Sequence, residues 1–267
     1  MRFNAILLAA LAVLAQPAAA FAQAPTGAPR ELSTDRPDQT ESPYTVDTGR
    51  LQFEVDLLNA TFDRIGDDRL RYSEGSALAV NAKVGLRSNI DLQFVLNPYA
   101  RVRLENDTRA GVASGIGDVE TRLKVNLWGN DGGRTAFGVM PYMKWPLPAS
   151  AIRNGKTEGG LIIPFAIDLG RGWGLGAMTE IDFLFDDGER TEGFVNSVTA
   201  SRGVTERAAM YIEIVSSVVV RRQTAWQLDL GATYAVGSDM QFDAGCNFGL
   251  NEAAPDFNPF AGFSVRF

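Results

Sequence analysis

The side chains that could perform chemistry in this chain are acidic and basic residues placed at every second position. Glu120, Arg122 and Lys124 show this spacing, with one uncharged residue between each pair. Carboxylates can act as general acids or bases, and arginine and lysine can bind anionic groups. The 267 residues include no histidine, which excludes Ser-His catalysis, histidine bases and histidine-ligated zinc. We therefore expect no catalytic residue, no metal site and no cofactor.

Alternation of this kind indicates β-strands, because successive side chains of a strand point to opposite faces. At 118–127 a helix would spread the charges around its circumference, whereas a strand places them on one face. We expect a polar stretch at 61–75 and a loop around 105–115. The alternation predicts about twelve strands, near residues 51–57, 78–87, 90–104, 118–127, 137–145, 161–169, 175–185, 193–202, 208–220, 226–234, 240–248 and 257–267.

The last stretch suggests how these strands are arranged. Phe263, Val265 and Phe267 are apolar, while Ser264 and Arg266 between them are polar. A chain that ends on such a strand could complete a soluble β-sandwich, where it would leave an unpaired edge. In a closed barrel the last strand pairs with the first, and no edge remains.

Three features favour the closed barrel. The expected number of strands is even, and short turns alternate with mostly longer loops. Aromatic residues such as Trp145, Phe183 and Trp226 lie on the apolar faces near strand ends. These are properties of outer-membrane barrels, whose apolar residues face lipid. The predicted fold class is therefore all-β, a single antiparallel transmembrane barrel in the bacterial outer membrane.

The start of the chain predicts export. Arg2, an apolar run at 5–15 and an Ala-Phe-Ala cleavage site at 20–22 form a secretory signal peptide over residues 1–22. Residues 23–48 are polar and rich in proline, so we expect an extended segment. Residues 49–267 form the predicted barrel.

The extended segment has two interpretations. It is either a solvated linker or a plug that folds into the mouth of the barrel. If it is a plug, we expect its charged residues to pair with charges of the lumen: Asp35, Arg36, Asp38 and Glu41.

The polar faces of the strands carry both signs of charge, which predicts a narrow, partly filled lumen. These residues either pair with one another for structural reasons or contact a solute. The candidates are Glu54, Lys83, Arg87, Arg101, Arg103, Glu120, Arg122, Lys124, Glu180, Asp182, Glu213, Asp229, Asp243 and Arg266.

Two stretches resemble a known family. They are STDRPDQTESPYTVDTG at 33–49 and FDAGCNFGLNEAAPDFNPFAGFSVRF at 242–267, and Gly115-Ile116-Gly117-Asp118 is similar as well. The family is that of the transporters of the MetA pathway of phenol degradation. The resemblance implies an outer-membrane barrel that moves small, often aromatic, compounds.

The expected function is therefore a channel or transporter for small organic solutes. A structural or adhesive barrel without transport is the alternative. An outer-membrane enzyme is less favoured, since no Gly-x-Ser-x-Gly motif accompanies the missing histidine. Expected partners are outer-membrane lipid, a small organic solute and the barrel-assembly machinery, which would act through the C-terminal strand. The net charge of −7 argues against nucleic acid.

Overall fold

The computed structural model describes residues 28–65, 70–106, 110–147, 155–186 and 188–267. The predicted signal peptide, residues 1–22, lies outside these ranges. The strands are β1 (Leu51–Ile65), β2 (Leu70–Ser76), β3 (Ala79–Arg87), β4 (Ile90–Leu96), β5 (Ala100–Glu105), β6 (Ala110–Gly115), β7 (Val119–Trp128), β8 (Thr135–Trp145), β9 (Glu158–Gly170), β10 (Trp173–Asp186), β11 (Glu189–Gly203), β12 (Ala208–Val219), β13 (Ala225–Ala235), β14 (Met240–Gly249) and β15 (Phe257–Arg266). No helix in the described part of the chain is long and apolar enough to cross a membrane.

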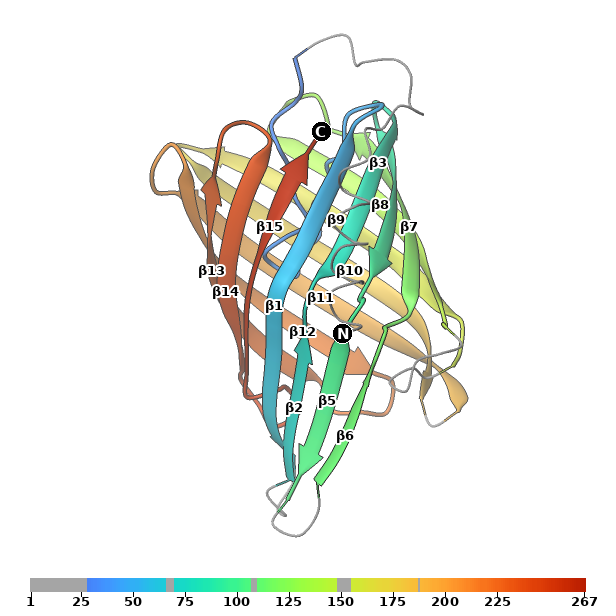
Figure 1. Cartoon of the computed structure of the whole chain (residues 1–267). Coiled ribbons are helices and arrows are strands. Elements are labelled where there is room, and N and C mark those ends of the chain that lie inside the picture. Colours follow the sequence, from blue (N-terminus) through green and yellow to red (C-terminus); the bar gives the residue numbers. More distant parts are fainter. Residues whose placement is uncertain (1–27, 66–69, 107–109, 148–154, 187) are drawn as a thin grey trace, which may run out of the picture.

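The strands form one antiparallel sheet that closes on itself (Figure 1). Closure comes from β1 and β15, where Gln52 pairs with Arg266 and Val55 pairs with Phe263. Three wall strands are interrupted, so that β2 with β3, β4 with β5, and β6 with β7 each occupy one position of the wall. The barrel therefore has twelve wall strands, and the predicted fold class is confirmed.

The side chains of the wall alternate between two environments. On β11, Phe194, Asn196 and Val198 are exposed, whereas Ser197 and Thr199 are buried. Apolar residues dominate the exposed face along the whole barrel, and buried charged residues dominate the other. A wall that is apolar outside and polar inside is the pattern of an outer-membrane barrel.

The two ends of the barrel differ. The turns that follow β3, β7, β9, β11 and β13 lie at the same end as the C-terminus and have two to six residues (Figure 1). Apart from the two-residue connection after β10, the connections at the other end have four to twelve residues. Outer-membrane barrels have short turns on the periplasmic side and longer loops outside. We therefore assign this end to the periplasm and the opposite end to the cell exterior.

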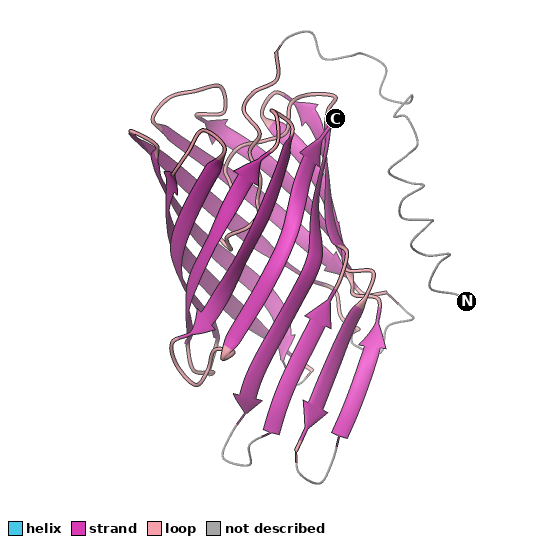
Figure 2. Ribbon diagram, turned by 60° about the vertical axis from the view of Figure 1, so that its left-hand side comes forward, coloured by secondary structure: helices cyan, strands magenta, loops and turns pink. Residues whose placement is uncertain are grey.

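Part of the wall extends beyond the rest at the exterior end, as Figure 2 shows. The far half of β1 pairs with β2, β2 pairs with β5, and β5 pairs with β6. The sequence patterns did not predict this extension: the polar stretch at 61–75 lies largely within β1 and β2, and the expected loop at 105–115 contains β6. Their polar residues obscured the alternation, because this sheet carries polar side chains on both faces.

Candidate functional site: the barrel interior

Residues 28–50 contain no named strand and run from the periplasmic rim into the periplasmic half of the barrel (Figures 1 and 2). The wall leaves room for the backbone and side chains of this segment at inward-facing glycines. A Cβ atom on Gly85 of β3 would lie 2.0 Å from the carbonyl oxygen of Asp47. A Cβ atom on Gly262 of β15 would lie 2.4 Å from the guanidinium of Arg36. The wall and the segment are thus fitted to each other.

Asp35 occupies the centre of the first group of contacts. Its carboxylate bonds to the ammonium groups of Lys83 and Lys124, and all three side chains are buried. Its backbone amide donates to the Glu54 carboxylate at 3.1 Å. Burial opposes ionisation of Asp35, but the charges of Lys124 and Lys83 outweigh it and hold the pKa of Asp35 well below its ordinary value.

Arg36 contacts the opposite end of the sequence. Its guanidinium donates to both carboxylate oxygens of Asp243 on β14, at 2.7 and 3.3 Å, and also to Asp56 on β1. The two-pronged geometry is the strong form of an arginine–carboxylate pair. Arg36 therefore ties the segment to the strands on either side of β15.

Gln39 and Thr40 bind carboxylates through their backbone. Their amides donate to the two oxygens of Glu213 at 2.8 and 2.7 Å. The Gln39 side chain donates to Asp229 at 2.7 Å, and the Thr40 hydroxyl lies 2.6 Å from that of Ser197. These contacts reach β11, β12 and β13. Sequence analysis missed Gln39 and Thr40, because only charged residues were considered as partners.

Asp38 lies close to Glu213 and not to a cation, although we expected it to pair with a lumen charge of opposite sign. Burial, together with the nearby Glu213 carboxylate, raises the pKa of Asp38 to about 8. At neutral pH this carboxyl is therefore largely protonated. The neutral form of the Asp38 carboxyl therefore favours docking of the segment.

Glu41 forms an ion pair with Arg122, which also binds Glu120 on the same strand. The amide of Glu41 points to the sulfur of Met178 at 3.4 Å. Met178 packs with Met140 and Ile162 in a buried apolar cluster on the inner wall. Here the segment adjoins the one apolar cluster of buried residues identified in the described lumen.

The remaining part of the segment leads out to the periplasmic end. Asn126 donates to the carbonyl of Pro43 at 2.8 Å, and the amide of Val46 donates to Asp91 at 3.0 Å. Arg30 bonds to Asp47 at 2.6 Å. Arg266 of β15 lies at the same end, where it donates to Asp239 at 2.9 Å.

Glu180 and Asp182 share the inward face of β10, and the hydroxyl of Tyr142 donates to Asp182. Glu180 also lies within electrostatic range of Glu41 of the segment and of Arg122. The structure therefore places most of the expected residues inside the barrel: Glu54, Lys83, Glu120, Arg122, Lys124, Glu180, Asp182, Glu213, Asp229, Asp243 and Arg266.

Three expected lumen residues lie elsewhere. Arg87 is exposed at the periplasmic end of β3. Arg101 and Arg103 are exposed on the outer face of the extension, since the buried Ala100 beside them faces inward. The interruption between β4 and β5 shifts the alternation by one residue, which reverses the direction of both arginines.

The comparisons with known proteins agree with this architecture. Residues 34–267 match the model of the Phenol_MetA_deg family, described as "Putative MetA-pathway of phenol degradation". The chain belongs to this family. The match includes all of the C-terminal stretch and all but the first residue of the N-terminal stretch that carried the resemblance.

Two solved structures share the fold of this family member. One is the COG4313 outer membrane channel from Pseudomonas putida F1, with 14% identity, a TM-score of 0.64, and 88% of this chain and 100% of that one covered. The other is the NanC porin, with 8% identity, a TM-score of 0.50, and 79% and 98% covered. No protein with a curated description matches.

Proposed function

We propose that the protein is a channel for small organic solutes, and that residues 28–50 close it until they move. The ring of contacts made by Asp35, Arg36, Gln39, Thr40 and Glu41 supports this proposal most. These contacts reach β1, β3, β7, β12, β13 and β14, so the segment crosses the lumen and does not line one side of it.

Aromatic compounds are the solute class that we propose. The family description refers to phenol degradation, and a channel family linked to that process would handle aromatic rings. The inner wall offers a matching surface in Met140, Met178 and Ile162, because thioether sulfur makes favourable contacts with aromatic rings. Arg122 is paired with Glu41 of the segment, so movement of the segment would free guanidinium N–H donors beside this cluster for a polar group of the solute.

A reversible lock tests whether the segment must move. Thr40→Cys with Ser197→Cys places two thiols where hydroxyl oxygens now lie 2.6 Å apart, in a Cys246→Ser background. Liposomes would report entry of a small aromatic acid and of an uncharged sugar of similar size. We expect the reduced protein to admit the aromatic acid faster, and the oxidised protein to admit neither.

The matched control is Thr40→Cys alone, in which solute flux should not change on oxidation. Equal flux through the oxidised and reduced double variant would show that the segment does not gate the channel. Equal entry of both solutes would indicate a general pore. If neither solute enters through the reduced protein, the proposed channel function is contradicted and a structural barrel is favoured.

A further inference from the structure

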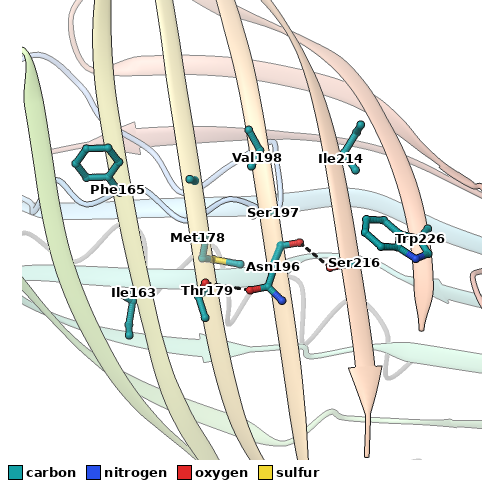
Figure 3. A pocket seen from close by; sticks show the side chains of 11 residues that line it. Ile163, Phe165, Met178, Thr179, Asn196, Ser197, Val198, Ile214, Ser216 and Trp226 are labelled. Atoms are coloured by element: carbon teal, nitrogen blue, oxygen red, sulfur yellow. Dashed lines mark hydrogen bonds between the residues drawn. The ribbon is translucent and has the colours of Figure 1, made fainter. Parts of the chain in front are cut away.

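A shallow hollow lies on the outer surface of the barrel wall (Figure 3). Its volume is about 550 Å³. The floor contains Thr179, Asn196 and Ser216 from β10, β11 and β12, which are neighbours in register. Phe165, Ile214 and Trp226 stand around them. A polar floor with an apolar rim is unusual on a surface that faces lipid.

The alternation of side chains along β11 places Asn196 on the outer face of the wall. The residues beside it in sequence, Val195 and Ser197, point inward, and Ser197 is buried against Thr40 of the segment. Asn196 itself is exposed. Its side chain therefore belongs to the membrane face and takes no part in the lumen site.

The depth of Asn196 follows from the charged residues on the same face of β11. The outward-facing positions of β11 between Glu192 and Arg202 are uncharged. The guanidinium of Arg202 lies 4.9 Å from the centre of the Trp173 ring. With a rise of about 3.3 Å per residue and a tilt of about 45°, the distance between Glu192 and Arg202 spans roughly 23 Å of membrane. This is close to the apolar band of about 25 Å, and Asn196 lies about 2 Å from its middle.

The amide of Asn196 is only partly satisfied at this depth. Thr179 donates its hydroxyl hydrogen to the amide oxygen at 3.0 Å, and Ser216 approaches the Asn196 backbone oxygen at 3.5 Å. The amide nitrogen has no hydrogen-bond partner among the residues that the structure describes. Reversing the amide would satisfy the nitrogen but leave the oxygen unpaired. Either orientation leaves a polar group in hydrocarbon, which is costly.

Lipid cannot satisfy this group, because acyl chains carry no hydrogen-bonding atoms at the middle of the bilayer and water is absent there. The surface of another protein can supply hydrogen-bond partners at this depth. We propose that the hollow is the interface at which a second copy of this chain docks in the membrane.

Two arguments favour a second copy over another protein. Copies in one membrane share orientation and depth, so a two-fold axis along the membrane normal places Asn196 of each copy at the depth of the other's Asn196. An amide carries both a donor and an acceptor and therefore complements itself.

Disulfide cross-linking in reconstituted bilayers tests this interface. Val198→Cys, two residues from Asn196 on the same outer face, would be oxidised in a Cys246→Ser background. The matched control is Leu123→Cys, an exposed outward residue of β7, four wall strands away. We expect a covalent dimer from Val198→Cys and none from Leu123→Cys.

Asn196→Leu supplies the second arm. Leucine is favourable in lipid, so the variant should fold and keep its heat-modifiable gel shift. We expect cross-linking through Val198→Cys to fall by roughly threefold or more, the effect of losing one or two hydrogen bonds in a membrane.

Three results would overturn the proposal: equal cross-linking at both cysteines, no dimer at any protein-to-lipid ratio, or unchanged cross-linking in Asn196→Leu. Native mass spectrometry from nanodiscs adds another test. A wild-type monomer that carries a bound lipid or small molecule, which Asn196→Leu releases, would assign the hollow to that ligand instead.

Discussion

The guanidinium of Arg36 lies 2.7 Å from the carboxylate of Asp243, although the two residues stand 207 positions apart in the chain. Asp243 is reached only after β14 has formed, next to the strand that closes the barrel. Docking of the N-terminal segment is therefore coupled to completion of the wall. A segment that formed its contacts early would offer Arg36 only Asp56 of β1, and not the two-pronged contact with Asp243.

This pair predicts a measurable coupling. Arg36→Met leaves Asp56 and Asp243 without their cation, which should weaken docking by roughly 3–5 kcal/mol. Combining it with Asp243→Asn should cost less than the sum of the single changes, by about 1–3 kcal/mol. Hydrogen exchange of the amides of Gln39 and Thr40 measures the docking free energy. Effects that add within about 0.5 kcal/mol would show that the pair is not coupled.

A second prediction concerns the space that the wall leaves for the segment. Gly85→Ala puts a methyl group into the backbone of Asp47, so the segment must shift away from β3. We expect faster hydrogen exchange across residues 44–48 and a larger single-channel conductance. Gly75→Ala is the matched control, because its Cβ would meet only Asn59 O at an ordinary 3.9 Å. If both variants conduct like the wild type, the fit at Gly85 does not hold the segment.

The class of the fold could be predicted from the sequence because its main signal is local. The charges at 118–127 alternate strictly, and β7 is found there. The extension could not be predicted as a whole, since polar side chains on both faces of β2 remove its period of two and β6 falls in an expected loop, whereas most of β5 lies within the expected strand at 90–104. The same limit explains Arg101 and Arg103, whose direction depends on a one-residue shift after β4 that a count in twos cannot detect.

The site was predictable in kind but not in detail. Four charged residues in a proline-rich segment suggested a plug, and Asp35, Arg36 and Glu41 do bond to charged wall residues. Which partner each would choose depends on distances across the lumen. Asp38 shows this limit, because its neighbour is the Glu213 carboxylate.

Asp38 predicts how docking depends on pH. Its ordinary pKa of 3.8 is raised to about 8 when the segment is docked, so the docked state binds the extra proton. The contribution of Asp38 to docking is therefore greatest below about pH 4. It weakens as the pH rises from 4 to 8 and changes no further above about 8. Asp35, whose pKa is lowered, acts in the opposite sense, and its contribution is lost only as the pH falls below 4.

We expect conductance to rise between pH 4 and pH 8, with Asp38→Asn showing a flatter profile because its amide does not titrate. Glu31→Gln is a suitable control, since Glu31 lies in the same segment but is exposed. The prediction fails if Asp38→Asn keeps the wild-type pH profile. The groups around Asp38 that share this region are Glu213, Glu41 and Tyr211.

The last prediction separates the inner face of the wall from the outer one. Arg122 binds Glu41 and Glu120 inside the barrel, so Arg122→Gln leaves two carboxylates unbalanced in the lumen. We expect the reversal potential in a KCl gradient to shift toward cation preference. Arg101→Gln removes the same charge from the outer face of the extension and should leave the reversal potential unchanged. A loosened segment changes the size of the current more than its preference for cations or anions, so the reversal potential reports the charge on the conduction path. Equal shifts in the two variants would place Arg101 on that path and contradict the outward direction given by the register of β5 with β2.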